Sequence, residues 1–211
     1  LEGLGSIEGV ARAKGELFEG LPPGAVAVVN IDDANVAAQA LRFDGRHLTF
    51  GVEGEAWVRS VACDRIDGST FELVHGEEAV EVNLPLPGRH NVQNALGAAA
   101  AALAAGIPLA TIGAGLSSME PPPMRFSAEV LANGVTLVND AYNANPGSTA
   151  AALATLGGLD ARRIVVLGDM LELGEQSAAL HHRAGEQAAA IDPLLVCAVG
   201  ASLALWWAIF A

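Results

Sequence analysis

Apolar and polar residues follow two different periods along the first part of the chain. Between residues 7 and 18 the apolar positions recur at helical spacing, which predicts an amphipathic helix. The largely apolar run 25–30 predicts a buried strand, and the pair Asp32-Asp33 suits the first turn of a helix that extends to Ala40. Such alternation of strand and helix is typical of an α/β fold.

The pattern changes to period two between residues 47 and 86. Residues 71–74 and 80–84 alternate apolar and polar side chains, and His75-Gly76-Glu77-Glu78 between them is a hairpin signal. We therefore expect an antiparallel sheet from residue 47 onward, after the parallel part. Two helices are predicted next, at 91–105 and 109–118, and the first is very rich in alanine, a strong helix former.

Three consecutive prolines, Pro121-Pro122-Pro123, form the strongest interruption in the chain. Consecutive prolines favour extended geometry and cannot continue a helix, so we place a domain boundary here, with domains at 1–122 and 123–200. The second domain is predicted to start with two strands around an Asn133-Gly134 turn and to continue with alternating helices and strands, at 146–156, 164–167, 177–190 and 194–199. This order indicates a doubly wound domain that stops early.

The end of the chain is uncharged from residue 194 to residue 211, which is just long enough for a membrane span. Gly200 and Ser202 interrupt this stretch, and no Lys or Arg flanks it. We therefore expect a buried strand followed by an unmatched apolar tail, 201–211, in preference to a membrane anchor. The start of the chain has neither an initiator Met nor a basic and apolar leader, so we also expect no signal peptide.

The amino-acid composition argues against several classes of function. Hydrophobic residues make up 52% of the 211-residue chain and charged residues 17%, which is ample for a buried core and excludes disorder as the main state. The formal net charge of −13 would repel phosphate backbones and anionic lipid, so we expect neither nucleic acid nor a membrane as a partner. Cys63 and Cys197 belong to no CxxC motif or Cys/His cluster, which argues against disulfides and zinc and favours a reduced, cytoplasmic setting.

Two amides lie at the start of the predicted alanine-rich helix, after Pro87-Gly88-Arg89-His90. Asn91 suits the N-cap position, and Asn94 lies one turn further along the same side. Such a pair can read the edge of a purine, or it can cap the helix without any further role. From the spacing alone, capping is the favoured interpretation.

A second polar group follows the apolar strand that ends at Val138. Asp140 comes at the carboxyl end of this strand, ahead of an amide-rich loop and a helix N-terminus. Ligands bind at this edge in α/β sheets, where a carboxylate suits a ribose diol, and the density of polar groups favours such a site over an ordinary loop with Asx-turns. Asp169 and Glu172 follow the next strand and would line the same edge if the two strands are parallel neighbours. Solvated loop charges are an equal alternative for either carboxylate.

Lys14 is the only lysine in the chain. A single lysine on a helix is usually a surface group. Gly15 and Glu16 follow it, so it ends no GxxxxGKS or GxxxxGKT segment, and none occurs elsewhere in the sequence. If the chain belongs to a nucleotide-using enzyme, the phosphate cradle of that enzyme is therefore not encoded here.

Four segments together resemble the Mur ligase family of bacterial cell-wall synthesis. They are 1–16, 88–95, 140–146 and 167–174, and they occur in the order and approximate spacing of that family. The His90-Asn91-x-x-Asn94 pattern is shared across Mur ligases. Asp140-Ala141-Tyr142-Asn143-Ala144-Asn145-Pro146, together with Gly168-Asp169-Met170-Leu171-Glu172-Leu173-Gly174, is similar to the branch that adds D-alanyl-D-alanine (MurF type).

The resemblance implies a fold and a reaction. The expected fold is α/β: the C-terminal part of the family's central ATPase domain, a mixed sheet with helices, followed by an incomplete Rossmann-like domain. Members of this branch join UDP-N-acetylmuramoyl-tripeptide to D-Ala-D-Ala using ATP and magnesium (Mg2+). The substrate carboxylate takes the γ-phosphate to become an acyl phosphate, which the dipeptide amine attacks, so positioning and charge stabilisation carry most of the catalysis.

The resemblance also implies roles for individual residues. Lys14 matches the lysine that the family carbamylates, because CO2 turns an amine into a carboxylate that can hold a magnesium ion. Asn91 and Asn94 match the adenine-contacting amides, Arg125 the arginine that reaches the nucleotide, and Asp140 the acid on the ribose hydroxyls. The loop that faces the nucleotide and the incoming dipeptide is matched by Tyr142, Asn143 and Asn145.

Departures from the family pattern imply an internal fragment that is inactive alone. A complete member has an N-terminal domain for the UDP-sugar, a phosphate loop and a metal-binding His ahead of the position of Leu1, and its C-terminal domain continues well past Gly200. Two alternatives stay open. One is a sister amide ligase of the folylpolyglutamate or cyanophycin type, against which Tyr142-Asn143-Ala144-Asn145 argues, and the other is a non-catalytic nucleotide-binding or scaffold module.

Overall fold

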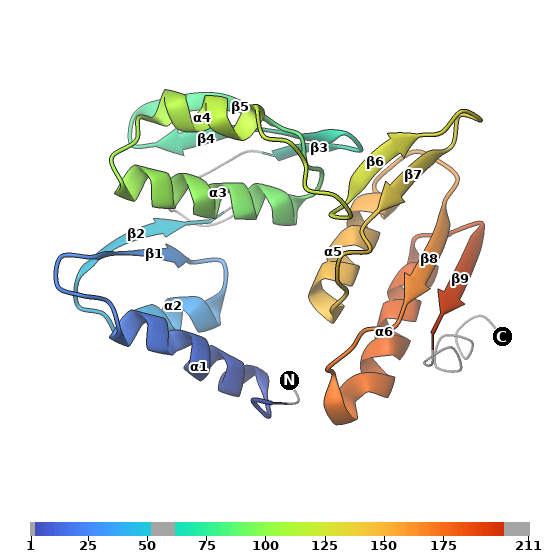
Figure 1. Ribbon diagram of the computed structural model, residues 1–211, viewed down its shortest axis with the longest axis horizontal. Helices are drawn as coiled ribbons and strands as arrows, with labels where there is room; N and C mark the ends of the chain where they lie inside the picture. Colours follow the sequence, from blue (N-terminus) through green and yellow to red (C-terminus); the bar gives the residue numbers. More distant parts are fainter. Residues whose placement is uncertain (1–2, 52–61, 201–211) are drawn as a thin grey trace. The chain divides into compact units, whose positions relative to one another are not determined.

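The chain forms two compact units that divide between Glu120 and Pro121. The computed structural model describes residues 3–51 and 62–200. We refer to residues 3–120 as the N-terminal unit and to residues 121–200 as the C-terminal unit, and Figure 1 labels the elements of each. Both units combine helices and strands, as the hydrophobic pattern predicts.

The N-terminal unit begins with a helix followed by a strand-helix-strand arrangement. Helix α1 spans Ile7–Glu19 and is capped by Ser6, whose hydroxyl oxygen accepts a hydrogen bond from the Gly9 amide at 3.1 Å. The next three elements are strand β1 (Val26–Asn30), helix α2 (Ala34–Ala40) and strand β2 (Arg46–Phe50). Their order confirms the predicted α/β alternation.

Strand β2 pairs with β1 in parallel, from Val26 opposite Arg46 to Asn30 opposite Phe50. The expectation of antiparallel pairing from residue 47 onward is therefore wrong for this strand. Period-two spacing identifies a strand but carries no information on its direction. The direction follows from the connection, because α2 crosses over and returns the chain to the end of the sheet where β1 began.

The predicted antiparallel sheet is present further along the chain. Strands β3 (Ala62–Arg65), β4 (Gly68–His75) and β5 (Glu78–Leu84) form it in that order. The hairpin signal joins β4 to β5, with His75 paired with Glu78 and Gly76 at a φ of 61°. Glycine adopts positive φ without strain, which is why Gly76 suits this turn.

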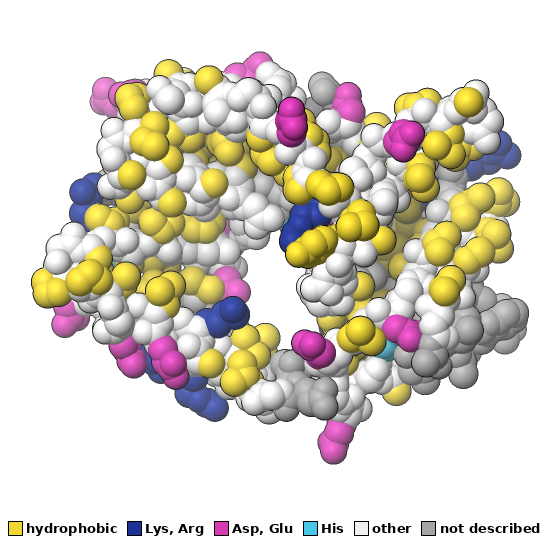
Figure 2. All heavy atoms as spheres, viewed as in Figure 1, with side chains coloured by type: hydrophobic (Ala, Val, Ile, Leu, Met, Phe, Trp, Pro, Cys, Tyr) yellow, Lys and Arg dark blue, Asp and Glu magenta, His cyan; other side chains and the backbone are white. Residues whose placement is uncertain are grey.

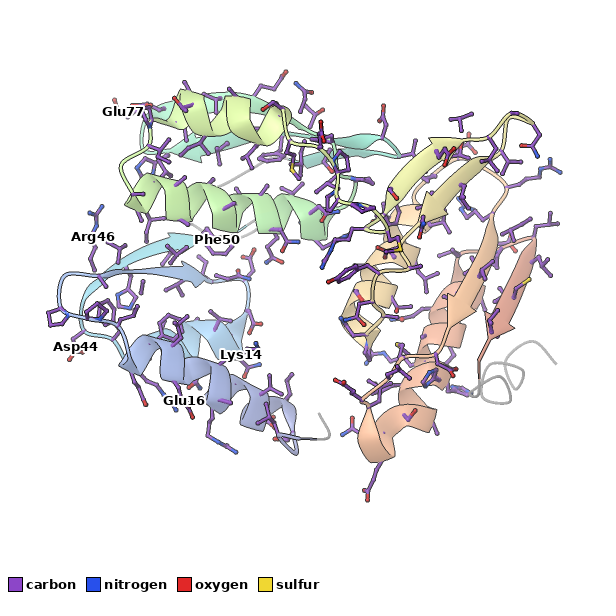
Figure 3. The ribbon with its side chains drawn as sticks, viewed as in Figure 1. Lys14, Glu16, Asp44, Arg46, Phe50 and Glu77 are labelled. Atoms are coloured by element: carbon purple, nitrogen blue, oxygen red, sulfur yellow. The ribbon has the colours of Figure 1, made fainter. Side chains whose placement is uncertain are left out.

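Helix α3 (Arg89–Ala104) lies between the β1–β2 pair and the antiparallel sheet, and α4 (Leu109–Ser117) packs on β5 (Figure 1). The many alanines of α3 have a packing role, because small side chains let this helix approach strands on both sides. The side chain of Phe50 points toward α3 (Figure 3), where a β-carbon at Gly97 would meet its ring. The main core of the unit contains Leu48, Phe71, Leu73, Val82, Leu84, Val92, Leu96, Leu109 and Ile112.

The C-terminal unit begins with a hairpin. Strands β6 (Ser127–Val130) and β7 (Thr136–Asn139) pair antiparallel around the predicted Asn133-Gly134 turn, in which Gly134 has a φ of 81°. The remaining elements follow in the predicted order: α5 (Pro146–Gly157), β8 (Ile164–Gly168), the 3-10 turn η1 (Gly174–Gln176), α6 (Ser177–Ala190) and β9 (Leu195–Val199).

Strands β8 and β9 form a parallel pair, with Ile164 opposite Leu195. One face of this pair is buried against α5 and α6, where Leu153, Val165 and Ala188 meet. The other face carries exposed apolar side chains, which Figure 2 shows over β8 and β9; they include Ile164, Val166, Leu195 and Val199.

Two further expectations concern the membrane and the cysteines. Within residues 3–51 and 62–200, no helix is both long enough and apolar enough to cross a membrane. The expected apolar tail, 201–211, lies outside the described residues, and the side chain of Cys63 is not described either. Cys197 on β9 is a free, half-buried cysteine.

Candidate functional site

Asn91 lies in the first turn of α3 and does not cap it. The helix begins at Arg89, and its N-cap is Gly88, at a φ of 94° and without a side-chain cap bond. The predicted N-cap role of Asn91 is therefore wrong, because Gly88 can adopt a backbone that turns the chain into the helix earlier. The Asn91 amide nitrogen instead donates to the Pro87 carbonyl at 2.8 Å. This bond fixes the amide group and leaves its oxygen to accept and a second hydrogen to donate.

Asn94 is exposed, one turn further along α3, on the side that Asn91 occupies. Gln93, just before Asn94, faces a different direction. Its amide nitrogen lies 3.4 Å from Oδ1 of Asn30 and 3.4 Å from Oδ2 of Asp32. The start of α3 is thus tied to the carboxyl end of β1.

None of Asn30, Asp32 and Gln93 is among the candidate site residues predicted from the sequence, where Asp32 is assigned only to the first turn of a helix. The signal was present, since Asn30 and Asp32 directly follow the apolar core of a strand. Gly51, after β2, lies against the same group, because a β-carbon there would overlap the Asp32 carboxylate. The carboxyl ends of parallel strands are where α/β sheets bind ligands, so this is the matching edge in the N-terminal unit.

Lys14 is exposed on α1. Gly15 and Phe18 of the same helix are buried, and Figure 3 shows Lys14 and Glu16 leaving α1 on different sides. Arg42, after α2, is paired with Glu19 at 3.1 Å, which fixes the far end of α1 against α2. Within the described parts of the chain, no three His, Cys, Asp or Glu side chains are grouped so that they could hold a metal ion.

Asp140 joins the two ends of the β6–β7 hairpin. Its Oδ1 accepts a hydrogen bond from the Phe126 amide at 2.9 Å, and the Tyr142 amide donates to the Met124 carbonyl at 3.0 Å. Met124 and Phe126 have φ values of 59° and 51°, a region that is costly for residues other than glycine. The two hydrogen bonds therefore hold a strained segment in place.

Arg125 lies between Met124 and Phe126, and its guanidinium covers the ring of Tyr142. The guanidinium carbon is 4.1 Å from the ring centre, and Tyr142 is 59% exposed. The C-terminal unit thus brings together three of the expected site residues: Arg125, Asp140 and Tyr142. The guanidinium suits the phosphate groups of a nucleotide, and the carboxylate suits its hydroxyl groups.

Asn143 and Asn145 use their side chains locally. Oδ1 of Asn143 accepts from the Ala144 amide at 2.9 Å. Asn145 is the N-cap of α5: its Oδ1 accepts from the Ser148 amide at 2.9 Å, while the Ser148 hydroxyl oxygen accepts from the Asn145 amide at 3.1 Å. Each side-chain oxygen therefore accepts one backbone hydrogen bond, and the side-chain NH2 group of each residue is the donor that it can offer a ligand.

The loop that contains Asp169 and Glu172 follows β8, whose parallel neighbour is β9. Strand β7 pairs with β6 in a separate sheet, so the condition under which Asp169 would line the same edge as Asp140 is not met. Asp169 lies instead against Gly200, where a β-carbon would overlap its carboxylate. His181, which no sequence pattern had indicated, is buried beside this loop.

Comparison with family models matches both units. Residues 1–102 match the Mur ligase middle domain, and residues 124–205 match the domain described as Mur ligase, glutamate ligase domain. Among curated relatives, the UDP-N-acetylmuramoyl-tripeptide–D-alanyl-D-alanine ligase of Escherichia coli is 40% identical over 201 residues, which cover 92% of this chain and 44% of the relative. The chain thus spans less than half the length of this relative.

Solved structures of Mur ligases also match the chain over part of their length. A crystal structure of MurF from Acinetobacter baumannii matches with a TM-score of 0.88 at 30% identity, over 98% of this chain and 46% of that one. The MurF ligase of Thermotoga maritima in complex with ADP matches with a TM-score of 0.80 over 94% of this chain and 49% of that one. The second likeness, at 23% identity, supports the fold alone.

Proposed function

The chain belongs to the Mur ligase family, and from this premise we propose that it is part of an ATP-dependent amide ligase of peptidoglycan synthesis. The proposed reaction adds D-Ala-D-Ala to UDP-N-acetylmuramoyl-tripeptide in the cytoplasm. The observation that carries the proposal is the 40% identity to the Escherichia coli enzyme named for this reaction, over 92% of the chain. We further propose that residues 1–122 belong to the central ATP-binding domain and 123–200 to the C-terminal domain.

We assign adenine contacts to Asn91 and Asn94. The edge of adenine offers an amino group to an acceptor and a ring nitrogen to a donor, which an asparagine amide can satisfy together. The bond from Asn91 to the Pro87 carbonyl uses one amide hydrogen and supports this role, because it orients the group while its oxygen and second hydrogen remain for the base. Asn94, exposed one turn along α3, can contact the same ligand.

We assign the nucleotide contacts of the C-terminal unit to Arg125 and Asp140. Asp140 carries four lone-pair sites on its carboxylate, so it can accept from the Phe126 amide and from ribose hydroxyls together. Stacking on Tyr142 occupies one face of the Arg125 guanidinium and does not use its in-plane N–H groups. Those groups suit phosphate oxygens.

Lys14 is proposed to hold magnesium as a carbamate. The amine is exposed, so CO2 can reach it, and the resulting carboxylate is the hard oxygen ligand that Mg2+ prefers. In the complete ligase, the other ligands would come from the metal-binding His ahead of the position of Leu1, from phosphate oxygens and from water. ATP, when bound, supplies the phosphoryl group that activates the substrate carboxylate.

Tyr142, Asn143 and Asn145 are proposed to face the dipeptide. The side-chain oxygens of both asparagines accept from backbone amides, which orients the side-chain NH2 groups as donors for a ligand. Amide hydrogens match the carboxylate and carbonyl oxygens of D-Ala-D-Ala. We expect the chain alone to be inactive, because it carries no GxxxxGKS or GxxxxGKT loop to stabilise the charge that develops on the phosphates.

A chimeric ligase tests the proposal. Residues 1–200 of this chain replace the matching segment of the Escherichia coli relative, which supplies the remaining parts. We expect phosphate release that requires ATP, UDP-N-acetylmuramoyl-tripeptide and D-Ala-D-Ala together, and none from the 211-residue chain alone. Release driven by glutamate in place of the dipeptide would assign the chain to a sister ligase, and a folded chimera without any release would contradict the proposal.

A further inference from the structure

A buried histidine holds the loop that follows β8. The Met170 amide donates to Nε2 of His181 at 3.0 Å, and Nδ1 of the same ring lies 2.8 Å from the carbonyl oxygen of Ser177. His181 is on α6, and it is 0% exposed. The ring therefore connects the first turn of α6 to the loop 168–174.

The two backbone partners of the ring each have a single hydrogen-bonding role, whereas the Ser177 hydroxyl, 3.3 Å from Nδ1, can donate or accept. The Ser177 carbonyl can only accept, and the Met170 amide can only donate. The ring must therefore carry its hydrogen on Nδ1 and accept at Nε2, which is one of the two neutral tautomers. Neither the other tautomer nor the imidazolium satisfies both bonds.

The hydrogen bond from the Met170 amide to His181 is buried, so its loss costs more free energy than the loss of a similar bond at the surface. Met170 is buried, and it packs with Leu173 of the same loop and with Ala184 of α6. Water cannot replace a lost partner for a buried amide, so the amide would keep its full desolvation cost. The shape of the loop consequently depends on an acceptor at the position of Nε2.

The residue next to Met170 explains why this loop matters. The carboxylate of Asp169 lies against Gly200, which follows β9, so it sits where both parallel strands end. This edge of a parallel sheet is where ligands bind. We propose that His181 is a positioning residue, which holds the loop 168–174, and with it the Asp169 carboxylate, at the carboxyl edge of β8 and β9. The effect of this positioning role on turnover rests on the proposed function.

The first test uses the 211-residue chain and no ligase activity. Imidazole 15N NMR is expected to find Nδ1 of His181 protonated and Nε2 unprotonated. His181→Phe keeps a flat ring without an acceptor, and it is expected to speed hydrogen exchange at the Met170 amide about tenfold, the effect of losing one buried hydrogen bond. His181→Gln offers a side-chain oxygen and should recover most of the protection. His182→Phe, at the exposed neighbour, is the matched control and should change nothing.

The second test uses the same variants in the chimeric ligase. We expect His181→Phe to lower kcat/KM for the dipeptide and His181→Gln to recover it. The opposite tautomer, unchanged Met170 exchange in His181→Phe, or a Gln variant as impaired as the Phe variant at equal melting temperature would overturn the proposal. Altered exchange with normal kcat/KM would also overturn it. An inactive native chimera would count against the proposed function alone, since the exchange and NMR results still decide the role of His181.

Discussion

The guanidinium carbon of Arg125 lies 4.1 Å from the centre of the Tyr142 ring, so residues from the two ends of the β6–β7 hairpin are in contact. Arg125 sits between Met124 and Phe126, which both have positive φ. Hydrogen bonds from the Tyr142 amide to Met124 and from the Phe126 amide to Asp140 hold this backbone. The direction of the guanidinium is thus set by the protein before any ligand binds.

Removing the Tyr142 ring is expected to weaken nucleotide use. In the chimeric ligase, Tyr142→Leu should raise the KM for ATP about two- to fivefold, since an exposed cation–π contact contributes about 0.5–1 kcal/mol. Tyr142→Phe retains the ring face and should leave the KM near its original value. Steady-state phosphate release measures both. Equal losses in the two variants would assign the effect to the hydroxyl group and contradict a role for stacking.

Arg163 joins the C-terminal ends of α5 and α6. Its Nε donates to the Leu156 carbonyl at 2.9 Å and its Nη1 to the Ile191 carbonyl at 3.2 Å. Its Nη2 donates to the Gly157 carbonyl at 3.0 Å and also to that of Leu159. A cation is favourable at a helix C-terminus, where unpaired carbonyl groups concentrate negative charge, and this guanidinium serves two helices.

Arg163→Met keeps most of the side-chain length but removes every donor. We expect it to lower the free energy of unfolding of the C-terminal unit by about 2–4 kcal/mol, because four partly buried carbonyl groups lose a charged donor at once. Arg162→Met alters the exposed neighbour and should change stability by less than about 0.5 kcal/mol. Urea denaturation followed by circular dichroism compares the two. Equal midpoints for both variants would rule out the helix-end role of Arg163.

The order of the elements could be predicted from the sequence because it depends on local properties. Apolar spacing, the Asn133-Gly134 turn and the Pro121-Pro122-Pro123 interruption each act over a few residues. The direction of β2 could not be predicted, since it depends on where α2 returns the chain. Nor could the sheets be told apart: β7 and β8 follow one another along the chain, yet β8 pairs with β9.

The candidate site was predicted less completely, because the same side chain can serve a fold or a ligand. Asn145 fits an amide-rich binding loop in sequence, and in the structure its oxygen caps α5. Asn91 fits an N-cap, and in the structure Gly88 takes that position, which frees Asn91 for another role. His181 escaped notice since its importance lies in a bond to Met170, which no local pattern encodes.

Glu8 provides a pH test of the start of α1. Its pKa is lowered, because its own backbone amide and the Ser6 hydroxyl donate hydrogen bonds to the carboxylate. A lowered pKa in the folded state stabilises the helix start above the unfolded pKa, and this contribution is lost as the pH falls through the folded value. NMR titration of the Glu8 carboxyl carbon should therefore give a low midpoint that rises in Ser6→Ala. An unchanged midpoint in that variant would exclude the Ser6 hydroxyl as a cause.

Two substitutions of Lys14 in the chimeric ligase separate a magnesium ligand from a surface residue. Lys14→Ala should reduce turnover by about two orders of magnitude or more, because losing a magnesium ligand removes several kcal/mol of charge stabilisation. The fold should stay intact, as Lys14 is exposed on α1. Phosphate release measures turnover, and the melting temperature reports the fold.

Lys14→Arg is the decisive variant. Arginine keeps the positive charge and the helix propensity of lysine, but its guanidinium stays protonated and forms no carbamate, so it offers the metal no carboxylate. We therefore expect Lys14→Arg to lose almost as much turnover as Lys14→Ala. Removing CO2 from the buffer should slow the native chimera, and bicarbonate should restore it, while both variants remain insensitive. Near-normal turnover in Lys14→Arg would mean that Lys14 is a solvated helix residue, and the carbamate assignment would have to be abandoned.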